Sequence, residues 1–177
     1  LRYIALLTAC AVTAHFTAYT YIVPLLQSLS HATATQIPLM LLVFGCAGII
    51  GNWLGARLSG SAGRSVGLSL LGLLVSFALL LGTTQFTLGI WGVLALWGII
   101  AALMNLALQS YALELAPHQH EAAASFCVTG FNAGIGTGAL IGGLVLPAGG
   151  ALAILGTGTL LACAALVILT RKPHLTN

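Results

Sequence analysis

Residues 87–112 read TLGIWGVLALWGIIAALMNLALQSYA and contain no Asp, Glu, Lys or Arg. A helix needs about 20 apolar residues to cross the hydrocarbon core of a bilayer, so this stretch is long enough for one transmembrane span. A transmembrane β-barrel would instead show alternating hydrophobicity in strands of about 10 residues. The unbroken run therefore predicts a membrane-spanning α-helix.

The composition of the whole chain agrees with a membrane location. Of its 177 residues, 4% are charged and 59% are hydrophobic, and the mean hydropathy is +1.10. Soluble domains carry about 25% charged residues, and disordered chains are poor in apolar ones. Both classes are excluded, and we predict an all-α membrane protein.

Apolar runs broken by turn signals predict the organisation of the chain. Pro24 is expected to kink the first span near its end, and Pro147-Ala148-Gly149-Gly150 is expected to form a tight turn. The longest polar interruption, over 114–121, predicts a surface loop. Six transmembrane helices are predicted, at about residues 4–29, 36–58, 65–82, 87–112, 122–146 and 151–170.

The basic residues predict the orientation. With six spans, all five of them fall on one side of the membrane, namely Arg2, Arg57, Arg64, Arg171 and Lys172. Loops rich in Lys and Arg face the cytoplasm, so both ends of the chain are expected there. Basic residues dispersed at span ends suit contact with membrane lipid headgroups and do not indicate a nucleic-acid partner.

Motifs for enzyme chemistry are weak in this sequence. Gly60-Ser61-Ala62-Gly63 resembles a nucleophile motif but lacks the strand–turn–helix context that such a motif requires. His118 and His120 lie two residues apart in a loop, which is weak spacing for a metal ligand pair. The four cysteines are in four different spans and include no CxxC. We expect no enzyme activity, no cofactor and no metal.

Polar side chains inside spans are expensive and tend to mark transport pathways. His15 and Tyr19 are one helical turn apart on one face of the first span, whereas Thr13 and Thr17 lie on the opposite face. A span that is polar on more than one side is expected to border a water-accessible cavity. His15 is also the one candidate in these spans for a group that titrates near physiological pH.

Amide side chains recur in later spans. Asn105 and Gln109 are one turn apart in the fourth span, and Asn132 follows Phe131 in the fifth. Amides both donate and accept hydrogen bonds, which suits a neutral polyhydroxylated or amphiphilic solute. We predict His15, Tyr19, Asn105, Gln109 and Asn132 as substrate-binding residues. Each could instead bond one helix to another.

Glycine repeats every four residues in the fifth span, at Gly130, Gly134, Gly138 and Gly142. A ridge without side chains lets another helix backbone approach closely, so we predict that these four residues pack helices together. No acidic residue lies in the middle of any predicted span, so these spans offer no carboxylate for proton relay.

Four stretches of the sequence carry a resemblance to a known family. VTAHFTAYTYI, residues 12–22 followed by Pro24, resembles the seventh helix of bacterial sugar efflux transporters, which are major facilitator exporters of arabinose and thiogalactosides. GCAGIIG, residues 45–51, resembles the eighth helix. LAP, residues 115–117, and FNAGIGTGAL, residues 131–140, are similar to the loop before the eleventh helix and to that helix. The last three are shared across the drug:proton antiporter group.

The resemblance covers nearly the whole chain and implies the C-terminal six-helix half of a twelve-helix fold, with the N-terminal half absent. It implies proton-coupled export of a small molecule, sugar or drug-like, across the bacterial inner membrane by alternating access, with the proton-binding carboxylate in the absent half. One departure is that the loop after the second span keeps Arg57 and Arg64 but has no acid. That departure puts an acid-based gating contact there in doubt.

Other functions remain open at this point. A multidrug exporter or a nucleoside exporter could use the same scaffold. A sugar cavity is expected to depend on hydrogen-bonding groups, and a drug cavity on aromatic and aliphatic ones. A different class is a non-transporting six-helix protein, either a remnant or an assembly partner.

Overall fold

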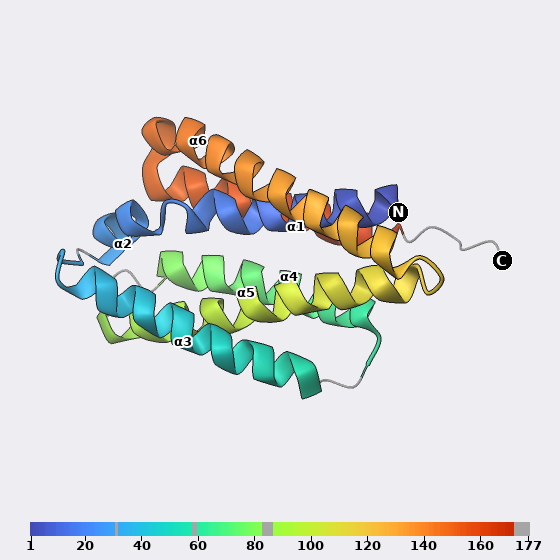
Figure 1. Ribbon diagram of the computed structural model, residues 1–177. Helices are drawn as coiled ribbons and strands as arrows, with labels where there is room; N and C mark the ends of the chain where they lie inside the picture. The colour runs from blue at the N-terminus through green and yellow to red at the C-terminus, as the bar shows by residue number, and fades with distance from the viewer. Residues whose placement is uncertain (31, 58–59, 83–86, 172–177) are drawn as a thin grey trace.

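The computed structural model describes residues 1–30, 32–57, 60–82 and 87–171, and every regular element in this part of the chain is an α-helix. The helices form an elongated bundle (Figure 1), which confirms the predicted all-α class. They are α1 (Arg2–Tyr19), α2 (Ile22–Ser30), α3 (Gln36–Arg57), α4 (Ala62–Gly82), α5 (Thr87–Leu115) and α6 (His120–Thr170).

α1 and α2 are two parts of one apolar rod, with a bend of 51° between Tyr19 and Ile22. Pro24 has no N–H to bond the carbonyl of Thr20 one turn earlier, and its ring crowds that carbonyl. The helix therefore breaks at Thr20 and Tyr21, and Pro24 falls in the first turn of α2, where its missing N–H costs little. The predicted kink is present, one turn before the proline.

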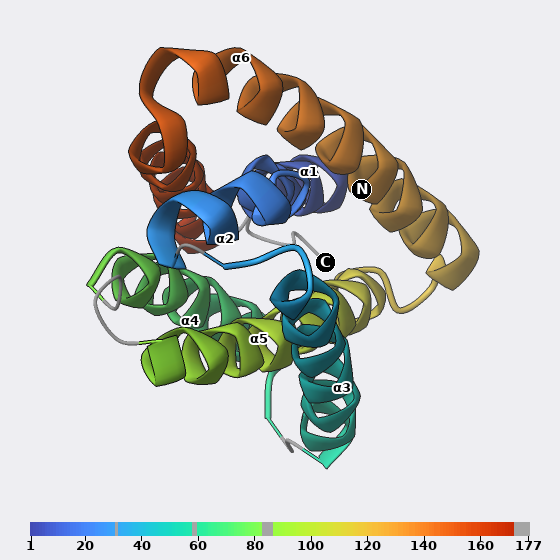
Figure 2. The same cartoon turned by 90° about the vertical axis from the view of Figure 1, so that its left-hand side faces the viewer.

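α6 consists of two arms that double back on each other (Figures 1 and 2). Its 51 residues would extend about 76 Å as a straight helix at about 1.5 Å per residue, more than twice the roughly 30 Å of a bilayer core. Gly149 and Gly150 have non-helical backbone angles, and Gly150 has φ of +58°, which favours glycine. The turn predicted over 147–150 is therefore present.

The described helices are long and apolar enough for several membrane crossings. Four of them could each cross a membrane, and the bent pair of α1 and α2 would make a fifth span. The turn inside α6 divides one of these five, which gives six apolar rods. The residues at which each of these rods enters and leaves the bilayer remain a prediction.

The described arginines gather at one end of the bundle. The start of α1, the end of α3, the start of α4 and the end of α6 all lie at that end (Figure 1). Arg2, Arg57, Arg64 and Arg171 belong to these helix ends. This arrangement is the one that the six-span prediction requires. The assignment of that end to the cytoplasm remains a prediction.

Helix ends at the same end of the bundle differ from the predicted span limits by up to about one turn. α4 begins at Ala62, before the predicted limit of 65, and α5 continues to Leu115, beyond the predicted 112. α6 begins at His120. The surface loop predicted over 114–121 is therefore reduced to 116–119.

Glu114, near the end of α5, bonds to the start of α4. Its Oε2 atom accepts a hydrogen bond of 2.8 Å from the backbone N–H of Ala62, the first residue of α4. N–H groups in a first turn lack partners within the helix, and a helix N-terminus favours negative charge. The loop between α3 and α4 has no acid of its own in the sequence. The structure adds that α5 supplies one, Glu114, to the start of α4.

Close helix packing holds α1 in the angle between the two arms of α6 (Figure 2). The predicted glycine ridge faces α1 there. A Cβ atom on any of the four glycines would lie 2.5 to 2.9 Å from an atom of α1 or of Tyr21, which follows it. At Gly134 the nearest atoms would be the Cβ of Val12 and the carbonyl oxygen of Ala9. The four glycines are all buried, and they are Gly130, Gly134, Gly138 and Gly142.

Candidate functional site

The predicted site residues lie in two separate places. His15 and Tyr19 belong to a cluster of aromatic rings at the contact of α1, α3, α4 and α5. Asn105, Gln109 and Asn132 line a pocket between α5 and the first arm of α6. Each place is built from helices that are far apart in the sequence.

The aromatic cluster begins as a stack of three rings. His15 and Tyr19 stack with ring centroids 5.2 Å apart and planes at 17°, as their spacing of one helical turn allows. Tyr19 also stacks on Phe44 of α3, at 5.1 Å and 30°. The neighbouring backbone makes room for this contact, because Gly98 of α5 packs directly on the backbone of Phe44.

Trp97 of α5 bonds to the first ring of this stack. Its indole Nε1–H donates a hydrogen bond of 3.2 Å to Nδ1 of His15, which is 82 residues away in the chain. Trp97 is 0% exposed and His15 is 5% exposed. A neutral hydrogen bond in so dry a setting is electrostatically stronger than the same bond in water, so it fixes both side chains.

The pocket between α5 and α6 has a volume of about 310 Å³, which is within the range of small-molecule sites. Asn105 and Gln109 face it from α5, and their amides have no hydrogen-bond partner among the described residues. Asn132 donates through Nδ2 to the carbonyl of Val128 over 3.0 Å, so its Oδ1 is left to accept. Phe131 adds an apolar wall. The pocket thus offers donors and acceptors beside one ring.

Thr13 and Thr17 do not line a cavity, which corrects the interpretation of α1 as polar toward water on two sides. Both are buried. Their hydroxyls donate to backbone carbonyls one turn earlier, Thr13 to Ala9 and Thr17 to Thr13, each at 2.7 Å. Such back-bonding satisfies a threonine inside its own helix. This face of α1 packs on the glycines of α6.

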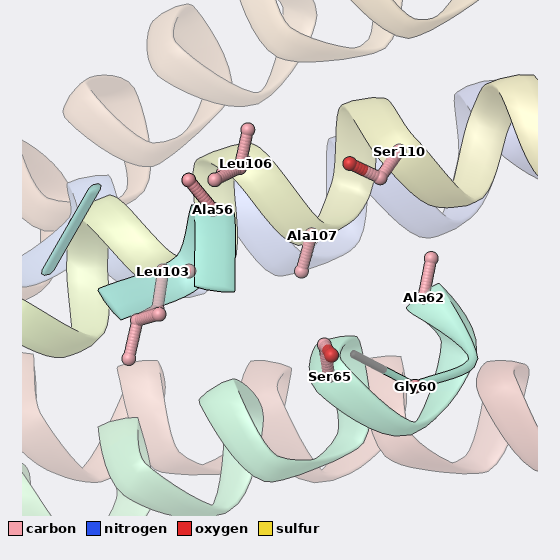
Figure 3. A pocket seen from close by; sticks show the side chains of 9 residues that line it. Ala56, Gly60, Ala62, Ser65, Leu103, Leu106, Ala107 and Ser110 are labelled. Atoms are coloured by element: carbon pink, nitrogen blue, oxygen red, sulfur yellow. The ribbon is translucent and has the colours of Figure 1, made fainter. Parts of the chain in front are cut away.

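A second pocket of about 300 Å³ lies among α3, α4 and α5 near the start of α4 (Figure 3). Ser65 of α4 and Ser110 of α5 are the polar side chains among the described residues that line it, and the others are small or aliphatic. Two hydroxyls recognise a solute less specifically than three amides do. The pocket between α5 and α6 is therefore the stronger candidate.

Sequence reasoning predicted His15 and Tyr19 but missed the other rings of the aromatic cluster, among them Trp97 and Phe44. Trp97 lies near the middle of the span predicted at 87–112, too deep for the interfacial belt where tryptophan usually occurs, and that depth is a usable signal of a buried partner. Phe44 carries no comparable signal, because one phenylalanine in an apolar span is ordinary.

Comparisons with known proteins agree with this architecture. The sequence model described as Major Facilitator Superfamily matches residues 4–177. The chain is similar to proteins named probable sugar efflux transporter from three strains of Haemophilus influenzae, PittGG, 86-028NP and Rd, at 38% identity over 138 residues. The match covers 77% of this chain but only 34 to 35% of each relative.

Proposed function

The chain belongs to the major facilitator superfamily, and from that premise we propose that it forms part of a secondary transporter that exports a small neutral solute, a sugar. The family match and the relatives, which are named as transporters, support a multi-pass membrane protein that moves a solute and is not an enzyme. The names of those relatives support the sugar.

One observation carries the sugar assignment. Asn105, Gln109 and Asn132 come from two helices and surround one pocket of about 310 Å³. A sugar presents hydroxyl groups that both donate and accept hydrogen bonds, and amides match both roles. A pocket for a hydrophobic drug would need apolar and aromatic side chains at these three positions.

The pocket is open on one side, which fits a site completed by another part of the protein. Transporters of this type are built from repeated halves with the substrate site between them, and transport proceeds by rocking of one half against the other. We propose that this chain supplies one wall and that a second six-helix half supplies the other, in the bacterial inner membrane. The end with the arginines would face the cytoplasm.

We also propose that export of the solute is coupled to protons. Glu114 and Glu121 are the two acidic residues of the sequence, and both lie at helix ends near the connection of α5 to α6. A carboxylate that carries a proton through the membrane would therefore come from the second half.

Efflux of labelled arabinose tests this function. Bacterial cells without their own sugar exporters would be loaded with arabinose, and the cells that express the complete gene are expected to lose the label several-fold faster than cells with an empty vector. Equal rates would overturn the sugar assignment. Faster loss of a hydrophobic dye or of a nucleoside, with arabinose unchanged, would favour one of the other exporters.

A further inference from the structure

Trp97 is held rigidly at the centre of the aromatic cluster. It is 0% exposed, and its ring meets the ring of Phe44 at 5.4 Å and that of Phe77 at 5.6 Å, both edge-on with planes at 82°. The rings of His15 and Tyr19 also lie edge-on to it. Edge-on contacts of this kind are favourable between aromatic rings. Contacts from α1, α3 and α4 thus leave the indole N–H one direction in which to point.

The hydrogen bond from Trp97 determines which nitrogen of His15 carries a hydrogen. The indole Nε1 can only donate, so Nδ1 of His15, at 3.2 Å, must accept and cannot carry a hydrogen. A neutral imidazole then has its hydrogen on Nε2. The contact therefore selects the neutral tautomer in which Nε2 is the donor.

Nε2 of His15 has no hydrogen-bond partner in the part of the chain that the structure describes. Within that part, the hydrogen bond of this side chain is the one from Trp97 to Nδ1. Among the described residues, no fully buried side-chain nitrogen or oxygen lacks a hydrogen-bond partner. Nε2 must therefore reach accessible surface, although the residue as a whole is 5% exposed. Nε2 is thus a single donor without a described partner in a nearly dry setting.

We propose that Trp97 is a positioning residue that makes His15 a fixed, neutral hydrogen-bond donor, and that Nε2–H of His15 binds a hydroxyl or ring oxygen of the transported solute at a contact separate from the amide pocket between α5 and α6. The inference rests on the proposed function. It adds that the contact selects among solutes, because an N–H donor binds acceptor oxygens and repels a cationic amine. It also replaces the interpretation of His15 as a proton carrier, since a second proton on Nδ1 would require the Trp97 bond to break.

Two substitutions of His15 distinguish the roles of its two ring nitrogens. In His15→Asn, the short amide can still offer an acceptor near the position of Nδ1 but has no donor where Nε2 was. In His15→Gln, the longer amide places a donor near the position of Nε2. In the protein expressed from its complete gene, we expect His15→Asn to weaken arabinose binding about tenfold, the effect of one lost hydrogen bond with its partner unpaired. His15→Gln is expected to keep most of the affinity.

A separate measurement reports the tautomer of His15. Its result would not depend on Trp97 if Trp97 only packed against its neighbours. Nitrogen-15 spectra of ring-labelled histidine distinguish a nitrogen that carries hydrogen from one that does not. The signal that disappears in His15→Gln belongs to His15 and is expected to show hydrogen on Nε2. Trp97→Phe keeps an aromatic ring without the N–H, and we expect hydrogen on either nitrogen of His15 and about fivefold weaker binding of arabinose.

The outcomes distinguish this inference from the proposed function. If the unaltered protein neither binds nor exports arabinose, the proposed function is wrong. If it does bind arabinose, the inference is overturned by hydrogen on Nδ1, by undiminished binding in His15→Asn, or by a Trp97→Phe variant that matches the unaltered protein in both binding and spectrum. Binding that falls in His15→Asn and Trp97→Phe and survives in His15→Gln supports it.

Discussion

Gly134→Leu is expected to destabilise the folded protein by about 3 kcal/mol or more, at the upper end of the cost of overpacking. A Cβ atom at this position would lie 2.7 Å from the Cβ of Val12 and 2.8 Å from the carbonyl oxygen of Ala9. The second of these is a backbone atom, so no change of rotamer relieves the clash. α1 would have to separate from the first arm of α6. Thermal unfolding of the complete protein in detergent measures the effect.

Gly136 provides the matched control, because it lies in the same turn of α6 and a Cβ there meets nothing within 4 Å. Gly136→Leu is expected to leave the unfolding temperature unchanged or slightly higher, since leucine favours helix over glycine by up to about 1 kcal/mol. Equal unfolding temperatures for the two variants would mean that α1 does not pack on this ridge.

Asn105→Leu combined with Gln109→Leu is expected to reduce sugar export at least tenfold, because each amide that bonds a sugar hydroxyl contributes about 1 kcal/mol or more. Leucine has a similar volume and suits an apolar helix, so the fold should persist. Export of a hydrophobic drug, if the protein has that activity, should be retained. The measurement is efflux of labelled arabinose, corrected for the amount of protein in the membrane.

Ser110→Leu is the control for this pair. Ser110 is next to Gln109 on α5 but lines the other pocket, so replacing its hydroxyl with the same apolar side chain should leave sugar export near its original rate. Full export by the double variant would remove the mechanistic support for a sugar site between α5 and α6.

Much of the fold could be predicted from the sequence because a membrane leaves few alternatives. An apolar run in lipid must satisfy its backbone internally, and a helix does so. Pro24 and the Pro147–Gly150 stretch break helices through their own backbone chemistry. The spacing of the glycines in α6 is also a property of one short stretch of sequence. It therefore predicts the ridge without knowledge of the helix that packs on it.

Contacts between distant segments could not be predicted in this way. The start of α4 at Ala62 depends on Glu114, which is 52 residues away, and the bond from Trp97 to His15 joins two helices. Thr13 and Thr17 look like cavity residues in the sequence because they are polar, yet each bonds to its own helix. Of the predicted site residues, the three amides share one pocket. His15 and Tyr19 lie apart from them in the aromatic cluster, and the sequence alone does not indicate this separation.

The pocket between α5 and α6 is the proposed sugar site. Protection of Asn132→Cys from alkylation tests sugar binding there directly, in a complete protein whose native cysteines are replaced by alanine. Residue 132 is exposed and lines the pocket, so its thiol should react readily with a maleimide. Leu144→Cys, which replaces a side chain that is 69% exposed outside the pocket lining, is the control.

Saturating arabinose is expected to slow the alkylation of Asn132→Cys several-fold and to leave that of Leu144→Cys unchanged. A rate at Asn132→Cys that is the same with and without arabinose, in a protein that still exports it, would contradict a sugar site at this pocket.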